Sequence, residues 1–422
     1  MSVRLASWSQ PASPRRAVLV AGIALIVFGA SWGLLHKGFY RHDQIVDTPV
    51  YQNYGDAIAN GKVPYRDFGL EYPPAALPVF VVPSLLRSPE GDLNAYRTWF
   101  EVEMVVVGEL GVLFVLAALL SLEAGPVRLA LALGFAALAP LLLGSVVLTR
   151  FDLWPAALTA AALAALLAGR DRLGAGVLGL AVAAKLYPLV LVPITCAWIW
   201  RRSGRRSALV SLAVLASVVL ACFLPFVVLA PHGVWDSLTR QTGRPLQIES
   251  LGAGVLLVLH QVAGTGITMR SSHGSQNLAG SGPDALATIQ TVLQALAVIG
   301  IWIWFGRGLA ERDRLVRACA AAVCAFIAFG KVLSPQFLIW LVPLVVLVRG
   351  RRGLAAGALF ALALLLTQLW FPFRYWDLAL HFAALPSWLV LARDLVLLAL
   401  LAVLVWPLQP RLGTFPGRVR SG

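Results

Sequence analysis

The sequence has little charge for its length. Only 13% of its 422 residues are charged, whereas soluble domains carry about 25%. Hydrophobic residues make up 59% of the chain, against roughly 45–50% in soluble domains. So few charged groups cannot cover a water-exposed surface of this size, and many apolar runs approach the roughly 20 residues that cross a bilayer. The composition therefore excludes a soluble globular protein and predicts a chain that crosses a membrane many times.

Cysteine is also scarce. The four cysteines, Cys196, Cys222, Cys319 and Cys324, all lie in apolar runs. This placement excludes a disulfide framework and a metal-ligand spacing, and favours apolar packing. The sequence has no nucleotide-binding glycine loop and no paired-carboxylate metal motif, so it points to no cofactor and no metal.

The net charge of +14 does not indicate nucleic acid. Lys and Arg form short clusters between apolar runs, such as Arg201-Arg202 and Arg205-Arg206, without the interleaved aromatic residues of a nucleic-acid groove. Clusters of this kind are typical of the basic loops that stay in the cytoplasm.

Hydropathy predicts an all-α fold: a polytopic transmembrane helical bundle of about twelve crossings, some of them short and broken at proline. The expected crossings are Ala17–Leu35, Trp99–Leu122, Arg128–Val147, Leu153–Ala168, Gly174–Lys185, Leu186–Trp200, Ala208–Ala230, Ala285–Phe305, Val316–Gly330, Phe337–Val348, Leu354–Phe371 and Trp388–Val405. The first is interpreted as an uncleaved span, because it is long for a secretory signal and lacks a small-x-small cleavage site. An even number of crossings places both termini on one side, and the basic clusters predict that this side is cytoplasmic. Residues 1–422 are expected to form one membrane-embedded domain.

Polar sequence is concentrated in two loops on the other side. The first, residues 36–97, is rich in acidic residues and contains the apolar segment Ala75–Leu86, which is too short to span. That segment is expected to lie in the interface or to dip back into the protein. The second loop, residues 231–284, contains the Ser/Gly-rich stretch Ser271–Gly282, which is expected to be flexible.

One pattern occurs twice. Lys185 is followed by Pro188 and Pro193, and Lys331 is followed by Pro335 and Pro343. Each occurrence predicts a lysine at the outer end of an outgoing helix, followed by a break at proline before the chain returns. A chance similarity between apolar segments is the alternative to a duplication, so only the geometry is predicted.

Several residues of the first loop could recognise a substrate. The loop places carboxylates, tyrosines and an arginine at the membrane surface: Asp43, Asp47, Tyr51, Arg66, Asp67, Glu71 and Tyr72. This combination suits a hydroxyl-rich substrate with a charged group. It equally suits a solvated loop whose aromatic residues anchor at the interface, and both interpretations stay open.

Ionisable residues also lie at the ends of spans. Arg150 and Asp152 flank a very short turn, and Lys185 and Lys331 end apolar runs. Charge at membrane depth is expensive and is a hypothesis of function by default. A structural ion pair and snorkelling lysines are the alternatives. We expect Arg150, Lys185 and Lys331 to converge on one cavity.

Four segments together resemble glycosyltransferase family 87. They are Asp47 to Pro74, Arg150-Phe-Asp-Leu-Trp-Pro155, Lys185-Leu-Tyr-Pro188 and Phe329-Gly-Lys-Val-Leu-Ser-Pro-Gln336. Each motif is weak alone, but their order and their positions relative to the spans make the match more specific. The resemblance covers roughly residues 17 to 405 and implies a GT-C-like membrane enzyme that uses a polyprenyl-phosphate sugar.

The resemblance implies transfer of a hexose, with mannose as the first candidate, to a lipid-linked or glycan acceptor outside the plasma membrane. An inverting transfer needs one carboxylate base and positive charge for the departing phosphate. Asp47 best matches the family's first-loop aspartate, with Asp43 as the alternative. The expected substrate-binding residues are Asp43, Tyr51, Arg66, Asp67, Glu71, Tyr72, Arg150, Asp152, Lys185, Tyr187, Lys331 and Gln336. His232 and His273 are possible contacts, although solvated loop histidines are the simpler interpretation.

Other interpretations remain. A twelve-span transporter or lipid flippase would also have broken helices with central charges. A noncatalytic assembly subunit would leave Asp47 dispensable. Within the family, an arabinofuranosyl donor is an alternative to mannose, and the sequence does not identify the acceptor.

Overall fold

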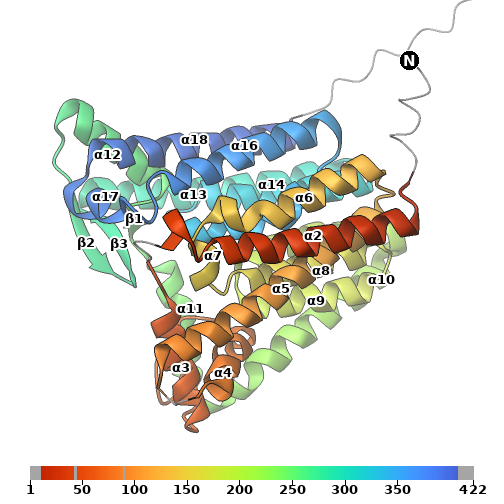
Figure 1. Ribbon diagram of the computed structural model, residues 1–422, viewed down its shortest axis with the longest axis horizontal. Coiled ribbons are helices and arrows are strands. Elements are labelled where there is room, and N and C mark those ends of the chain that lie inside the picture. Colours follow the sequence, from red (N-terminus) through yellow and green to blue (C-terminus); the bar gives the residue numbers. More distant parts are fainter. Residues whose placement is uncertain (1–10, 42–44, 89–90, 407–422) are drawn as a thin grey trace, which may run out of the picture.

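The computed structural model describes residues 11–41, 45–88 and 91–406, which form a helical bundle with a small sheet (Figure 1). The helices of the first half are α2 (Pro14–Leu34), η1 (Gly38–Arg41), α3 (Thr48–Ala59), η2 (Pro74–Ala76), α4 (Leu77–Leu86), α5 (Leu93–Ser121), α6 (Pro126–Leu143), α7 (Val146–Thr149), α8 (Leu153–Leu167) and α9 (Asp171–Ala184). Those of the second half are η3 (Tyr187–Leu191), α10 (Val192–Leu229), α11 (Pro231–Thr242), α12 (Leu251–Ala263), α13 (Ser281–Arg307), α14 (Arg312–Ala328), η4 (Pro335–Leu341), α15 (Val342–Val345), α16 (Gly350–Gln368), α17 (Tyr375–His381) and α18 (Ala384–Val405). The strands are β1 (Leu246–Gln247), β2 (Thr268–Ser272) and β3 (Ser275–Ala279). The expected all-α membrane bundle is confirmed.

Each expected crossing coincides with a helical segment of the structure. By length and composition, 7 helical segments of the described chain are long and apolar enough to cross a membrane. Helix α10 covers two expected crossings, because Gly204 interrupts it with φ 86° and ψ 167°. The crossings at α8, α9, α14 and η4–α15 are shorter helices. The protein is therefore a multi-pass membrane protein whose bundle combines long and broken helices.

The outside of the bundle is apolar. Val18 and Ile26 on α2 are 72% and 74% exposed, and Val228 on α10 is 71% exposed. Extended apolar surface of this kind is rare on soluble monomers, so these faces contact lipid. Inside, small residues allow close packing: a Cβ at Gly108 of α5 would lie 2.3 Å from the Phe28 ring of α2.

Both described ends of the chain lie at the same end of the bundle. The backbone N–H of Ala12 donates to the Ala124 carbonyl, and Arg352 donates to the Trp406 carbonyl. The ion pair between Arg202 and Asp171 joins two turns at this end. The opposite end, here called the loop end, carries α3, α11 and the sheet, on the left in Figure 1.

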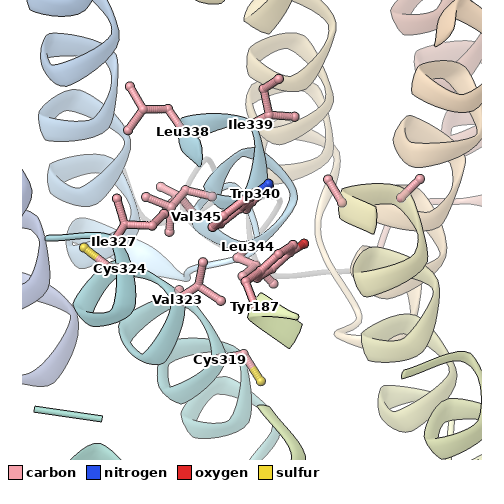
Figure 2. Close-up of a cluster of buried hydrophobic side chains, with 14 of the residues drawn as sticks. Tyr187, Cys319, Val323, Cys324, Ile327, Leu338, Ile339, Trp340, Leu344 and Val345 are labelled. Atoms are coloured by element: carbon pink, nitrogen blue, oxygen red, sulfur yellow. The ribbon is translucent and has the colours of Figure 1, made fainter. Parts of the chain in front are cut away.

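The two lysine–proline turns have the predicted geometry. Lys185 follows α9 and Lys331 follows α14, and after each lysine a 3-10 helix leads the chain back into the bundle. Figure 2 shows the two returns meeting, with Tyr187 of η3 beside Trp340 of η4. Cys319 lies among the apolar side chains of the same cluster, as expected for a packing residue.

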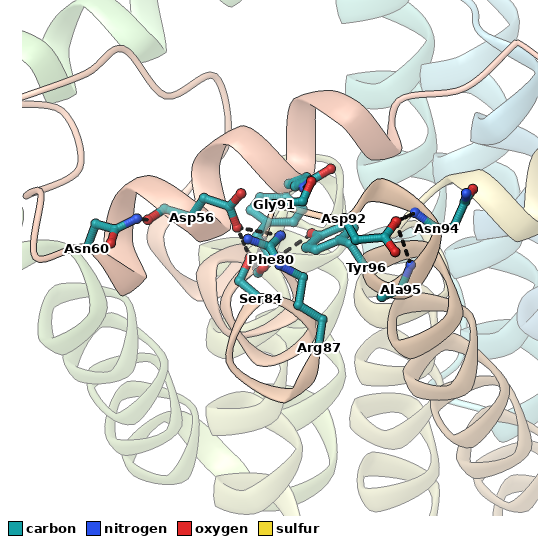
Figure 3. Close-up of polar contacts among 11 residues, drawn as sticks. Asp56, Asn60, Phe80, Ser84, Arg87, Gly91, Asp92, Asn94, Ala95 and Tyr96 are labelled. Carbon is teal, nitrogen blue, oxygen red and sulfur yellow. Dashed lines mark hydrogen bonds and ion pairs between the residues drawn. The ribbon is translucent and has the colours of Figure 1, made fainter. Parts of the chain in front are cut away.

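Helix α4 packs on α3 and α5 at the loop end. Arg87, just after α4, pairs with Asp56 of α3 at 2.7 Å, and the Tyr96 hydroxyl of α5 donates to the Phe80 carbonyl at 3.2 Å (Figure 3). Leu85 is nevertheless 65% exposed. Of the two expectations for this apolar segment, the interfacial one therefore fits better.

The expectation of a flexible loop at residues 271–282 is wrong. Strand β3 pairs antiparallel with both β1 and β2. His273 and Gly274 make the two-residue turn between β2 and β3, and both have positive φ (53° and 66°), as a type I′ hairpin requires. The Asn277 side-chain amide donates to the Ser272 carbonyl at 2.9 Å, which closes the hairpin.

Candidate active site

An open cavity lies at the loop end, between the two lysine turns. Its volume is about 1080 Å³, which includes the solvent at its mouth. The first loop, the Lys185 turn, the second long loop and the Lys331 turn line it, together with Gln294 of α13 and Phe326 of α14. Six of the expected substrate-binding residues share its wall: Glu71, Tyr72, Lys185, Tyr187, Lys331 and Gln336.

Asp152 holds Lys185 in place. The Asp152 side chain is fully buried, and its Oδ1 accepts hydrogen bonds from Lys185 Nζ and Trp340 Nε1, each at 2.6 Å. The ammonium group also lies 4.6 Å from the centre of the Phe151 ring, a favourable cation–π distance. The carboxylate thus compensates the charge of the lysine and fixes its direction.

Three aromatic rings stack beside Lys185. The Tyr187 and Trp340 rings are 4.1 Å apart and nearly parallel, at an interplanar angle of 3° (Figure 2). The Phe337 ring lies 4.2 Å from Trp340 on a similar plane. The Tyr187 hydroxyl is 2.9 Å from the Thr159 hydroxyl, which anchors the stack to α8. The cavity therefore has a rigid apolar wall next to a cation, which suits a ligand with both apolar and anionic parts.

The second long loop holds Lys331. Lys331 Nζ donates to the Thr242 carbonyl at 2.8 Å, and the Gln247 N–H donates to the Lys331 carbonyl at 2.9 Å. Nearby, Gln336 Oε1 is buried with no hydrogen-bond partner in the described part of the chain. A ligand donor in the cavity could satisfy it.

Arg244 is a third cation of the cavity, and it was not predicted. Its guanidinium donates to the His273 carbonyl at 3.2 Å and to the Ser275 hydroxyl at 3.1 Å. Its Nε is buried without a partner among the described residues, and burial lowers the pKa of the group. Among residues 11–41, 45–88 and 91–406, no carboxylate forms an ion pair with Arg244 or Lys331.

Arg150 does not join these cations. It forms an ion pair with Asp47, just before α3, and only 7% of its side chain is exposed. Neither residue belongs to the lining of the cavity. Lys185 and Lys331 thus reach one cavity, as expected, whereas Arg150, paired with Asp47, is not part of its lining. Arg244 takes the third position.

Tyr51 lies between Asp47 and the cavity wall. It is fully buried, and its hydroxyl is 3.5 Å from Asp47 Oδ2. Its ring meets the Tyr72 ring edge-on at 5.9 Å, and Tyr72 lines the cavity. Asp47 itself keeps 32% of its side chain exposed. The Asp47 carboxylate is thus separated from the cavity by Tyr51 and Tyr72.

The remaining candidates lie elsewhere. Arg66 and Asp67 are exposed and pair with each other at 2.9 Å, and hydrogen bonding from Arg66 lowers the pKa of Asp67 to about 2. Neither lines the cavity. His232 is exposed, as expected for a solvated histidine. Asp43 lies outside the described residues.

Comparisons with known proteins find a family match and a structural similarity. A model of glycosyltransferase family 87 matches residues 70–335, a range that includes all three cavity cations and begins after Asp47. In structure, the chain is similar to ArnT from Cupriavidus metallidurans, crystallised bound to undecaprenyl phosphate. The TM-score is 0.49 and the identity 16%, over 92% of this chain and 76% of that one. A search of curated proteins finds no match.

Proposed function

The chain belongs to glycosyltransferase family 87, and from this premise we propose that it transfers a hexose, mannose, from a polyprenyl-phosphate carrier to a hydroxyl of a lipid-linked or glycan acceptor. One observation supports a phosphate-linked donor: Lys185, Arg244 and Lys331 reach the same cavity from three segments. Among the described residues, two of these cations have no carboxylate partner. They are free to bind a phosphate, which lysine and arginine do through charge-assisted hydrogen bonds.

The proposed reaction is a single displacement at the anomeric carbon. The acceptor oxygen forms a bond to that carbon as the bond from the carbon to the phosphate oxygen breaks. The bonding electrons leave with polyprenyl phosphate, and the configuration inverts. Asp47 takes the acceptor proton as general base, and its ion pair with Arg150 holds the carboxylate in position for that role. The three cations stabilise the charge on the departing phosphate.

We place this reaction outside the plasma membrane. The end of the bundle opposite the loop end carries arginine clusters such as Arg201, Arg202, Arg205 and Arg206. By the positive-inside rule this end, which holds both described ends of the chain, faces the cytoplasm. The loop end and its cavity then face outward, where lipid-linked sugars rather than nucleotide sugars would serve as donors.

The test uses purified protein in detergent with polyprenyl-phosphate mannose labelled in the sugar. In the presence of acceptor-containing membrane lipids, we expect labelled product and an equal amount of free polyprenyl phosphate. A parallel arm with polyprenyl-phosphate arabinofuranose tests the sugar. Intact donor in both arms would overturn the proposal. A flippase would leave the donor intact, because moving a lipid breaks no bond.

A further inference from the structure

A second, polar cavity adjoins the first. Its volume is about 660 Å³, including the solvent at its mouth, and it is lined by Glu71, Arg240, Gln241, Arg244, Ser272 and His273. Glu71, Gln241 and Arg244 also line the first cavity, so these three residues form the border between the two. Among the described residues, no aromatic stack or lysine lines the second cavity, which is built from the first loop, α11 with the segment that follows it, and the β2–β3 hairpin.

The walls of the second cavity are fixed by contacts that leave its charged groups free. The Gln241 side chain donates to the Glu71 carbonyl at 3.2 Å, which joins α11 to the first loop. Arg244 donates to the His273 carbonyl, which joins the hairpin to the same wall. In the part of the chain that the structure describes, neither Arg240 nor the Glu71 carboxylate takes part in an ion pair.

Unpaired charges of both signs in one cavity suit a particular ligand chemistry. A carboxylate such as Glu71 accepts hydrogen bonds from sugar hydroxyls. Arginine binds phosphate or carboxylate groups through its fork of N–H donors. With two arginines and one carboxylate, the second cavity has a positive balance. Its complement is a hydroxyl-rich molecule that carries a negative group.

We infer that the second cavity is the acceptor subsite, and that it selects an acceptor with an anionic group, such as a phosphate, near the sugar that is glycosylated. This inference rests on the proposed function. Arg244, at the border, serves both cavities. Arg240 lines only the second one, so it is the specificity-determining residue whose loss should affect the acceptor and not the donor.

The experiment measures binding directly. Octyl α-mannoside and its 6-phosphate are titrated into the purified full chain below their micelle concentrations. We expect the phosphorylated probe to bind at least about tenfold more tightly, as expected for a charge-assisted contact. Arg240→Gln should abolish that difference. Arg270→Gln is the matched control, because Arg270 is an exposed arginine of β2 that lines neither cavity, and this variant should keep the difference.

Three outcomes would overturn the inference. Equal binding of the two probes to the wild type would show that no anionic group is recognised. Inorganic phosphate that binds as tightly as the phosphorylated probe would indicate a site for free phosphate. A comparable loss of polyprenyl-phosphate mannose affinity in Arg240→Gln would assign Arg240 to the donor. Because binding requires no transfer, these results are separate from failure of the proposed function, which appears as an intact donor in the activity assay.

Discussion

Lys185 and Asp152 form an ion pair of 2.6 Å at the loop end, with 13% and none of their side chains exposed. The same carboxylate oxygen accepts the Trp340 indole N–H. One buried oxygen therefore joins the start of α8, the turn after α9 and the η4 return. The direction of the lysine depends on all three segments, and so does the shape of the cavity that it lines.

Asp152→Asn should destabilise the protein. The substitution leaves the Lys185 ammonium group without its charged partner, and breaking one side of a buried pair costs about 3–5 kcal/mol. We expect a clear fall in the apparent melting temperature in detergent. The double variant Asp152→Asn/Lys185→Met should recover much of the loss, because no unpaired charge remains, yet it should bind the donor weakly. A stable single variant would contradict this account of the pair.

The sequence predicted the lysines of the site because each is a lone charge at the end of an apolar run. Lys185 and Lys331 stand out against hydrophobic neighbours, and a proline follows each at short distance. Arg244 has no such signal, since it is one of several arginines in a polar loop. Its contacts with the β2–β3 hairpin hold it at the cavity, and these depend on the tertiary structure.

The pairing of Asp47 with Arg150 could not be read from the sequence either. The two residues are about a hundred positions apart, and pairing across that separation depends on how α3 docks against the α7–α8 turn.

The sheet was missed for a different reason. The Ser/Gly-rich composition hid the His273-Gly274 turn, because composition does not show which residues adopt positive φ.

Lys331→Met should weaken donor binding more than it lowers stability. One charge-assisted hydrogen bond to phosphate contributes about 1.5–3 kcal/mol, so the KM for polyprenyl-phosphate mannose should rise roughly tenfold to a hundredfold. Lys62→Met is the matched control, because Lys62 is an exposed lysine of the first loop outside the cavity lining. An equal rise in KM in both variants would indicate a general surface effect instead of a phosphate contact.

The orientation is testable with introduced cysteines. Asn60, after α3, and Arg205, at the α10 break, are both exposed and lie at opposite ends of the bundle. In intact cells, a membrane-impermeant maleimide should label Asn60→Cys, and it should label Arg205→Cys only after lysis. Unmodified protein gives the background of its own cysteines. The reverse pattern would move the cavity to the cytoplasmic side and contradict the proposed donor.

Glu249 should make stability depend on pH. It is 2% exposed, and burial raises its pKa to about 8, although Arg393 and Arg150 act in the opposite direction. The folded state therefore holds the proton more tightly than the unfolded state. The resulting stability is fully present below about pH 4.5, the ordinary pKa of the group, and is lost as pH rises through 8. We expect the apparent melting temperature to fall between pH 6 and pH 9, and Glu249→Gln to fall less. Parallel curves for the two proteins would show that another group is responsible.

Asp47→Asn should lower the rate of transfer by about 10²–10⁴, the usual contribution of a general base. The same change removes the partner of Arg150, whose side chain is 7% exposed, so this variant should also lose stability. A fall in activity alone therefore cannot distinguish a base from a structural partner. Asp43→Asn provides the comparison within the same loop, and it should transfer at close to the wild-type rate.

The double variant Asp47→Asn/Arg150→Met separates the two roles of Asp47. Once Arg150 is replaced, no buried cation is left without its carboxylate partner. The apparent melting temperature should therefore return toward that of the wild type. If Asp47 is the base, kcat should stay low in the double variant while the KM for the donor stays near normal, because Lys185, Arg244 and Lys331 are intact. If Asp47 only neutralises Arg150, transfer should recover together with stability. Recovery of transfer, or loss of transfer in Asp43→Asn with an active Asp47→Asn, would remove Asp47 from the mechanism.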